Sequence, residues 1–162
     1  MSELDLIRNQ FGVYFLAQNR KCTYVPYQQE AICPALEALE RHEIPGNKLA
    51  FFLPPRMGKS TVVTMNFPAW YLGRHPDHNA IVVSYSADLA VGFGRTTKNL
   101  VKSPIHRATF PRCEIPLDAR ANDDFGLTEG GHYFSMGLDG TITGRGANIF
   151  IIDDPVKNTQ DA

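Results

Sequence analysis

The chain has 162 residues, of which 43% are hydrophobic and 20% are charged, and its formal net charge is −1. This balance is typical of one globular domain with room for a sizeable core, and it excludes a chain that is basic throughout for binding nucleic acid. No apolar run approaches the roughly 18 residues that cross a bilayer, the polar start MSELDLIRNQ does not predict a secretory signal, and three widely spaced cysteines indicate free thiols in a reducing cytosol.

Two helices are predicted before the first strand. The first begins at Ser2, a capping residue followed three positions later by Asp5, and it frays near Asn19. The second covers about residues 28–42 and is stopped by a Pro-Gly-Asn stretch. We therefore expect a single domain over 1–162 in two parts, a helical segment over 1–47 and a core over 48–162.

Three continuous apolar runs of strand length follow, at residues 49–53, 80–85 and 148–155. Continuous apolarity is typical of strands that are buried on both faces of a parallel sheet. A helix is predicted from Gly58 to about Leu72, and another begins after the second run with Ser86 as its cap. The order strand–helix–strand–helix–strand predicts an α/β fold with helices flanking the sheet.

The stretch FPAWYLGRHPDH at 67–78 mixes aromatic and imidazole side chains. Trp70 and Tyr71 are expected in the core, because they lie in an apolar run. His75 and His78 lack a spacing that suggests a metal site, so a solvated loop is expected there.

Two further features lie between the second and third apolar runs. A segment without acidic residues carries Arg95, Lys98, Lys102, Arg107 and Arg112. A solvated helix face and a phosphate-facing patch both explain it. Farther on, residues 130–144 predict a β-hairpin closed by an Asp-Gly turn, directly before the last strand.

Residues 51–61 read FFLPPRMGKST, which ends like the nucleotide-binding pattern G-x-x-x-x-G-K-[ST] but has Leu53 in place of the first glycine. A phosphate-binding loop needs backbone N–H groups at a helix N-terminus, a lysine that reaches the β- and γ-phosphates, and a hydroxyl that holds Mg²⁺. Gly58, Lys59 and Ser60 supply these parts, and they lie between a predicted strand and a predicted helix.

The start of this loop is unusual because Pro54 and Pro55 cannot donate a backbone hydrogen bond. The cradle would therefore be formed by the amides from about Arg56 through Met57 to Thr61. The fixed φ angles of the prolines could pre-set the loop in place of glycine flexibility. The Arg56 side chain adds a second cation close to the expected γ-phosphate.

The last strand, FIIDD, ends in two carboxylates, as the Mg²⁺-holding segment of a nucleotide hydrolase requires. In a parallel sheet its carboxyl end lies at the same edge as the loop after residues 49–53, where α/β sheets bind ligands. Asp153 would hold the metal and Asp154 would act as the general base for the attacking water. A strand that simply ends in a turn is the alternative for this sequence alone. The two motifs in this order predict nucleotide hydrolysis.

The segments LPPRMGKS, FPAWYLGRHPD, SYSADLA and TGRGANIFIIDDPVKN together resemble the large terminase subunit of tailed bacteriophages, in its N-terminal ATPase region. The resemblance covers roughly residues 24–158. It implies a P-loop NTPase of the ASCE type that hydrolyses ATP with Mg²⁺ and drives double-stranded DNA into proheads. It also implies a homo-oligomeric ring, a prohead portal and a small terminase subunit as partners, and the host cytoplasm as location.

The resemblance carries roles onto single positions. The Gly-Lys-Ser triplet matches the phosphate loop, Arg56 matches an arginine thought to contact the γ-phosphate, and Asp153 matches the Mg²⁺ aspartate. Asp154 falls where many terminases have a catalytic glutamate, one methylene longer.

Two further matches concern the base and the neighbouring subunit. Tyr27-Gln28 looks like a glutamine motif that recognises adenine, with a glutamine at a helix N-terminus as the alternative. Arg145 is similar to an arginine that some ring-forming terminases donate to the neighbouring subunit's ATP. Its flanking glycines would leave the guanidinium free to project, and a surface arginine in a glycine turn is the alternative.

The sequence also departs from the family pattern. Family members continue past the acidic strand to a coupling motif and a nuclease domain, and neither is present here. A later strand inserts beside the phosphate-loop strand in this class, so we expect a sheet that is incomplete at the C-terminus, with unpaired strand edges. A truncated, non-hydrolysing nucleotide-binding or assembly module is therefore an alternative function. Another DNA-dependent motor, such as a helicase, would need motifs beyond the acidic strand.

Overall fold

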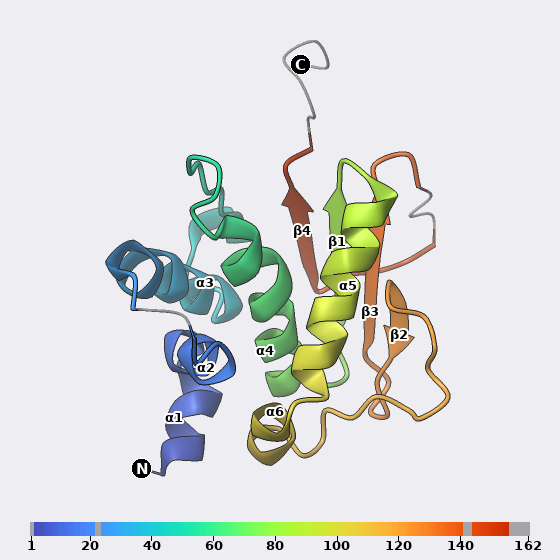
Figure 1. Cartoon of the computed structure of the whole chain (residues 1–162), viewed down its shortest axis with the longest axis horizontal. Helices are drawn as coiled ribbons and strands as arrows, with labels where there is room; N and C mark the ends of the chain where they lie inside the picture. Colours follow the sequence, from blue (N-terminus) through green and yellow to red (C-terminus); the bar gives the residue numbers. More distant parts are fainter. Residues whose placement is uncertain (1, 22–23, 141–143, 156–162) are drawn as a thin grey trace.

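The computed structural model describes residues 2–21, 24–140 and 144–155. Its strands are β1 (Asn79–Ser84), β2 (Asp124–Gly126), β3 (His132–Gly137) and β4 (Ile149–Asp153). They form a four-stranded sheet in the order β2-β3-β1-β4 (Figure 1). β1 runs parallel to β3 and β4, while β2 is antiparallel to β3. The predicted α/β class is confirmed, with a mixed sheet.

Helices cover one face of this sheet or pack against the helices that do. They are α1 (Glu3–Asn9), α2 (Phe11–Gln18), α3 (Cys33–Glu40), α4 (Phe67–Arg74), α5 (Ala87–Val101) and α6 (Pro104–Thr109). π-helical turns at Gln28–Ile32 and Ser60–Asn66 lead into α3 and α4, and a 3-10 turn covers Pro45–Asn47. In Figure 1, α5 crosses in front of β1 and β3, α4 lies beside it, and α1 to α3 lie beyond α4. No helix in the described ranges is long and apolar enough to cross a membrane.

Two predicted helix caps are confirmed. The Ser2 hydroxyl accepts from the Asp5 N–H at 3.1 Å, and the Asp5 carboxylate accepts from the Ser2 N–H at 3.0 Å, which completes a capping box. The Ser86 hydroxyl accepts from the Leu89 N–H at 3.3 Å and begins α5. The first predicted helix differs in one respect, because it is interrupted at Gln10 and continues as α2.

The prediction of a strand over residues 49–53 is wrong for this structure, since these residues belong to no β-ladder and Phe52 is 93% exposed. A cavity of about 670 Å³ separates this segment from β4, and its lining includes Phe51, Phe67 and Ile151. Apolar residues make a strand only where a neighbouring edge supplies hydrogen-bond partners. Within the described ranges, no strand pairs with the edge of β4 that faces away from β1.

The predicted hairpin over 130–144 is also wrong in its pairing. β3 forms its first half, but the antiparallel partner of β3 is β2, which precedes it, and the turn between them spans Leu127 to Gly131. The turn at Asp139-Gly140 exists, with the Gly140 N–H donating to the Gly137 carbonyl at 3.0 Å. The predicted second half falls on residues 141–143, which lie outside the described residues.

The core lies between the sheet and the helices and is rich in aromatic rings. Phe11 meets Phe67 edge-on at 5.4 Å between centroids and Trp70 at 5.5 Å. Trp70 and Tyr71 are 1% and 4% exposed, which confirms the expectation that they are core residues. The opposite sheet face carries a separate small cluster of Ile81, Val83, Phe134 and Met136. Cys33 and Cys113 are buried free thiols, and Cys22 lies outside the described residues.

His75 and His78 lie in a loop between α4 and β1, as predicted, but both are half-buried and not solvated. Their rings stack at 4.7 Å, and His78 Nδ1 lies 2.9 Å from the Tyr71 hydroxyl. The buried Glu40 carboxylate accepts from Arg74 Nε at 2.8 Å and contacts His75 Nε2 at 2.7 Å. Burial alone raises the pKa of Glu40, but these two partners hold it below its ordinary value. The motif therefore joins α3 to α4.

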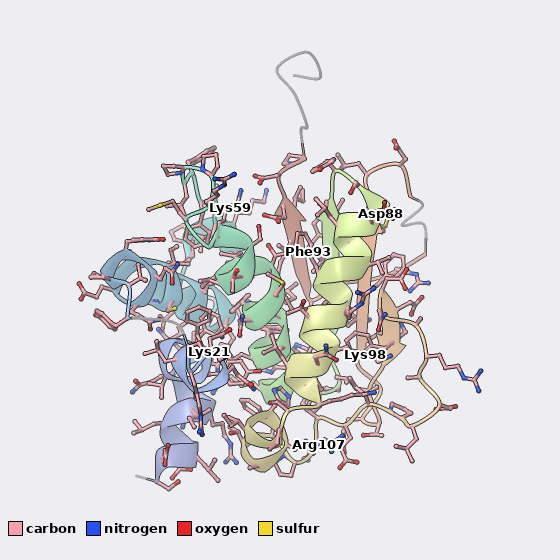
Figure 2. The ribbon with its side chains drawn as sticks, viewed as in Figure 1. Lys21, Lys59, Asp88, Phe93, Lys98 and Arg107 are labelled. Atoms are coloured by element: carbon pink, nitrogen blue, oxygen red, sulfur yellow. The ribbon has the colours of Figure 1, made fainter. Side chains whose placement is uncertain are left out.

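The basic segment does not form one uniform surface. Lys98 is buried, and its ammonium donates to the carbonyls of Ala119 and Ala121 at 2.7 and 2.6 Å; burial lowers its pKa. Arg112 forms an ion pair with Glu129 at 2.6 Å. The exposed cations of the segment that remain are Arg95, Lys102 and Arg107. Figure 2 shows Lys98 on the lower half of α5 and Arg107 on α6 below it.

His106 makes the stability of this fold depend on pH. It is fully buried beside the Tyr14 hydroxyl, 2.9 Å from Nδ1, and burial lowers its pKa from 6.5 to about 3. Between these values the unfolded chain binds a proton that the folded chain does not. The free energy of unfolding should therefore fall as the pH drops below about 6, by about 1.4 kcal/mol per pH unit from this group.

Urea unfolding of the wild type and a His106→Gln variant between pH 7 and pH 4 measures this contribution. The glutamine does not titrate, so the stability advantage of the wild type should shrink by about 2–3 kcal/mol across the range. Parallel stability curves for the two proteins would contradict the assignment.

Candidate functional site

The loop between residues 53 and 61 has a backbone that only certain residues adopt easily. Gly58 has φ +76° and Arg56 has φ +64°, both in the left-handed region. A Cβ on Gly58 would lie 2.7 Å from Gln28 Nε2, so the Gln28 side chain would have to move from its present position. The helical turn begins directly after this glycine, with the Val62 N–H donating to the Gly58 carbonyl at 3.1 Å. The loop conformation therefore depends on Gly58.

A cavity of about 330 Å³ lies over this loop and the start of the following helix. Its lining consists of residues 53–61 and Asp154. A helix N-terminus leaves its first N–H groups without partners inside the helix, and together with the helix dipole these attract anions. Lys59, Ser60 and Thr61 supply such groups, and the exposed Arg56 adds a charge. The cavity is thus suited to an anionic group.

Two carboxylates at the end of β4, Asp153 and the following Asp154, lie against the loop lysine. Lys59 Nζ is 3.7 Å from Asp153 Oδ1 and forms a close ion pair with Asp154 Oδ1. Asp153 is buried, whereas Asp154 is exposed and has φ +42°, an uncommon value for a non-glycine residue. Figure 2 shows Lys59 beside the loop, at the edge of the sheet toward which β1 and β4 run. The structure thus brings together the residues that the sequence places at one sheet edge.

The chemistry of these groups fits a hard cation. Mg²⁺ takes oxygen ligands and keeps part of its ligand sphere as water or substrate phosphate. Ser60 offers a hydroxyl, and Asp153 offers a carboxylate at the adjoining strand end. No group of three or more histidine, cysteine or acidic side chains that could enclose a metal occurs in the part of the chain that the structure describes.

Tyr27 and Gln28 lie beneath the loop. Gln28 Nε2 donates to the Met57 carbonyl at 3.0 Å and to the Tyr27 hydroxyl at 3.2 Å, and that hydroxyl also donates to Met57 O in a short hydrogen bond. Gln28 is 8% exposed. Gln28 begins the Gln28–Ile32 turn, and this position agrees with the alternative interpretation, a glutamine at a helix N-terminus.

Arg145 lies just before β4 begins, at the end of the strand opposite to Asp153. Its guanidinium is not free to project, as the flanking glycines suggested, because Nη2 pairs with Asp124 Oδ2 at 3.0 Å and the group lies 3.9 Å from the centre of the Phe134 ring. His132 contacts the second oxygen of Asp124. Burial raises the pKa of Asp124, but hydrogen bonds from His132 and Arg145 hold it below its ordinary value. Arg145 therefore lies a strand length away from the loop of its own chain.

Sequence reasoning missed the partners of these residues. The Met57 carbonyl is a backbone atom, and no side-chain pattern marks it. Asp124 and His132 come from β2 and β3, whose antiparallel pairing was not predicted. An acidic residue and a histidine eight positions apart around a glycine turn were the only signal available.

One family model matches the chain, described as "Terminase large subunit, T4likevirus-type, N-terminal", over residues 50–162. The match includes Gly58, Lys59, Asp153 and Asp154, and it begins after Tyr27 and Gln28. Comparison with curated proteins and with solved structures gave no match.

Proposed function

The chain belongs to the terminase large-subunit family, in its T4-like N-terminal region, and from this premise we propose that it is the Mg²⁺-dependent, ATP-hydrolysing part of a motor that packages viral double-stranded DNA into proheads. One observation supports the chemistry above others. The ammonium of Lys59 lies against Asp153 and Asp154 at a helix N-terminus, beside a cavity lined by the loop. Nucleotide hydrolysis needs the groups that bind phosphate, hold a metal and position water to lie close together.

Each residue of the site has its own role in the proposed reaction. The N–H groups of Met57 through Thr61 and the Lys59 ammonium bind the phosphates, and Arg56 contacts the γ-phosphate. Ser60 and Asp153 would hold Mg²⁺, which would supply positive charge beside the phosphate oxygens. Asp154 accepts the proton of the attacking water.

The ion pair between Lys59 and Asp154 links nucleotide binding to the hydrolysis that follows it. When bound phosphates draw Lys59 away, Asp154 loses this partner, and its carboxylate is free to accept a hydrogen bond from the attacking water. Nucleotide binding thus prepares the base for hydrolysis.

The motor would act as a ring of copies on the prohead portal in the host cytoplasm, with a small terminase subunit as a further partner. A non-hydrolysing nucleotide-binding module is the second candidate. It is favoured by residues 49–53, which lead into the loop without belonging to the sheet.

Calorimetric titration with MgATP tests the phosphate site. A Lys59→Ala variant should bind MgATP about 10- to 100-fold more weakly than the wild type, because a charge-assisted hydrogen bond is lost. Lys102→Ala, at the exposed end of α5, is the matched control and should bind normally. Equal affinity of the wild type and Lys59→Ala would contradict the proposal. Phosphate release by the same proteins separates the two candidates, since a non-hydrolysing module binds without releasing phosphate.

A further inference from the structure

The amide nitrogen of Gln28 faces groups of the protein itself. Gln28 Nε2 lies within hydrogen-bond distance of the Met57 carbonyl at 3.0 Å and the Tyr27 hydroxyl at 3.2 Å, and these two acceptors lie together on one side of the amide nitrogen. A glutamine reads adenine by donating to N7 while it accepts from N6. This pairing needs the amide to face a base, whereas Gln28 is 8% exposed and its amide nitrogen faces the Met57 carbonyl.

The same two side chains meet at one atom of the loop. The Met57 carbonyl accepts from both Tyr27 and Gln28. Met57 lies between Arg56 and Gly58, the two residues of the loop with positive φ. A carbonyl held by two donors fixes the peptide plane between Met57 and Gly58, and with it the direction of the N–H group that Gly58 offers to an anion.

Close packing reinforces this contact. The space where a Gly58 side chain would begin is occupied by Gln28 Nε2, at 2.7 Å. Gln28 therefore contacts the loop backbone, and it is not among the residues that line the cavity.

We infer that Tyr27 and Gln28 are positioning residues that hold the phosphate loop by the Met57 carbonyl, and that they contribute to the binding of the triphosphate without regard to the base. This inference rests on the proposed function. It replaces the interpretation of these residues as readers of adenine, and it makes them equally important for any ligand that carries the same phosphates.

Three probes of one phosphate chemistry test the inference, namely MgATP, MgGTP and magnesium tripolyphosphate, which has no base. Gln28→Met keeps the length of the side chain but removes both donors, and Tyr27→Phe removes one. Each variant should weaken binding of all three probes by a similar factor, about fivefold for one lost hydrogen bond. Tyr24→Phe is the control, since Tyr24 contacts Glu30 and not the loop. Tyr27→Phe keeps the test decisive if Gln28→Met does not fold.

A local readout separates loop positioning from general destabilisation. Limited trypsin digestion should cleave after Arg56 several times faster in Gln28→Met and Tyr27→Phe, while cleavage after the exposed Arg120 keeps its wild-type rate. Loss confined to MgATP, or unchanged binding of all probes, would overturn the inference. Equal acceleration at both cleavage sites would overturn it as well.

The failures of the two proposals are distinguishable in the same titrations. A wild type that binds none of the three probes overturns the proposed function and this inference with it. Binding that depends on Lys59, combined with an effect of Gln28→Met on ATP alone, overturns the inference and leaves the proposed function intact.

Discussion

An Asp154→Asn variant is expected to lose ATP hydrolysis by roughly 10²- to 10⁴-fold while it still binds MgATP, because a general base contributes about that much to a rate. Its affinity for MgATP should equal or exceed that of the wild type. Lys59 forms its closest ion pair with Asp154, and an uncharged amide would leave the ammonium free for phosphate. A loss in rate together with retained binding is the signature of a group that acts in the transition state.

Asp153→Asn should give a different signature. Asp153 is buried at the end of β4 and is proposed to hold the metal, so its loss should raise the Mg²⁺ concentration needed for half-maximal activity. Asp118→Asn, at an exposed loop position, is the control for removing a carboxylate. Phosphate release across a Mg²⁺ titration measures all three variants. If Asp153→Asn and Asp154→Asn show the same Mg²⁺ dependence as the wild type and lose no rate, neither carboxylate has its proposed role.

The meeting of Lys59 with Asp153 and Asp154 could be predicted because it depends on few decisions. An apolar run locates β4 and the two carboxylates at its end, but the prediction placed the loop beside them through a strand over residues 49–53 that this structure does not form. The turn from Gly58 into the following helix depends only on the backbone conformation of neighbouring residues. The periodicity, caps and strand ends that carried these predictions are all properties of neighbouring residues.

The contacts that could not be predicted join residues far apart in the chain. Lys98 looked like part of a basic surface, yet it is buried, and two carbonyls 21 and 23 positions away accept hydrogen bonds from its ammonium. Residues 49–53 read as a strand, but pairing is decided by the neighbouring edge and not by the segment itself. The Glu40 carboxylate on α3 contacts His75, which directly follows α4. Each of these outcomes depends on tertiary contacts that leave no periodic pattern.

Arg145 gives the sharpest test of assembly, because its own loop lies at the other edge of the sheet. β4 separates the two, and its five residues span about 16 Å at the usual rise of a strand. A direct role of this guanidinium in hydrolysis therefore requires a neighbouring copy, whose loop would take it from Asp124 and Phe134. An arginine supplied in this way is worth about 10³-fold or more in rate, so Arg145→Ala should lower turnover by at least about 10³-fold. Binding of MgATP should stay at the wild-type level.

Mixing two inactive variants decides whether the arginine acts between copies. A Lys59→Ala chain lacks its own phosphate lysine but keeps Arg145, and an Arg145→Ala chain has the reverse defect. In a ring, the arginine of the first serves the loop of the second, so a mixture should recover activity that neither variant has alone. Arg120→Ala, exposed on a loop, controls for loss of a surface charge. A mixture as inactive as its parts, with rings formed, would assign Arg145 to the surface ion pair with Asp124 and no further role, because complementation is the one outcome that a contact within a single chain cannot produce.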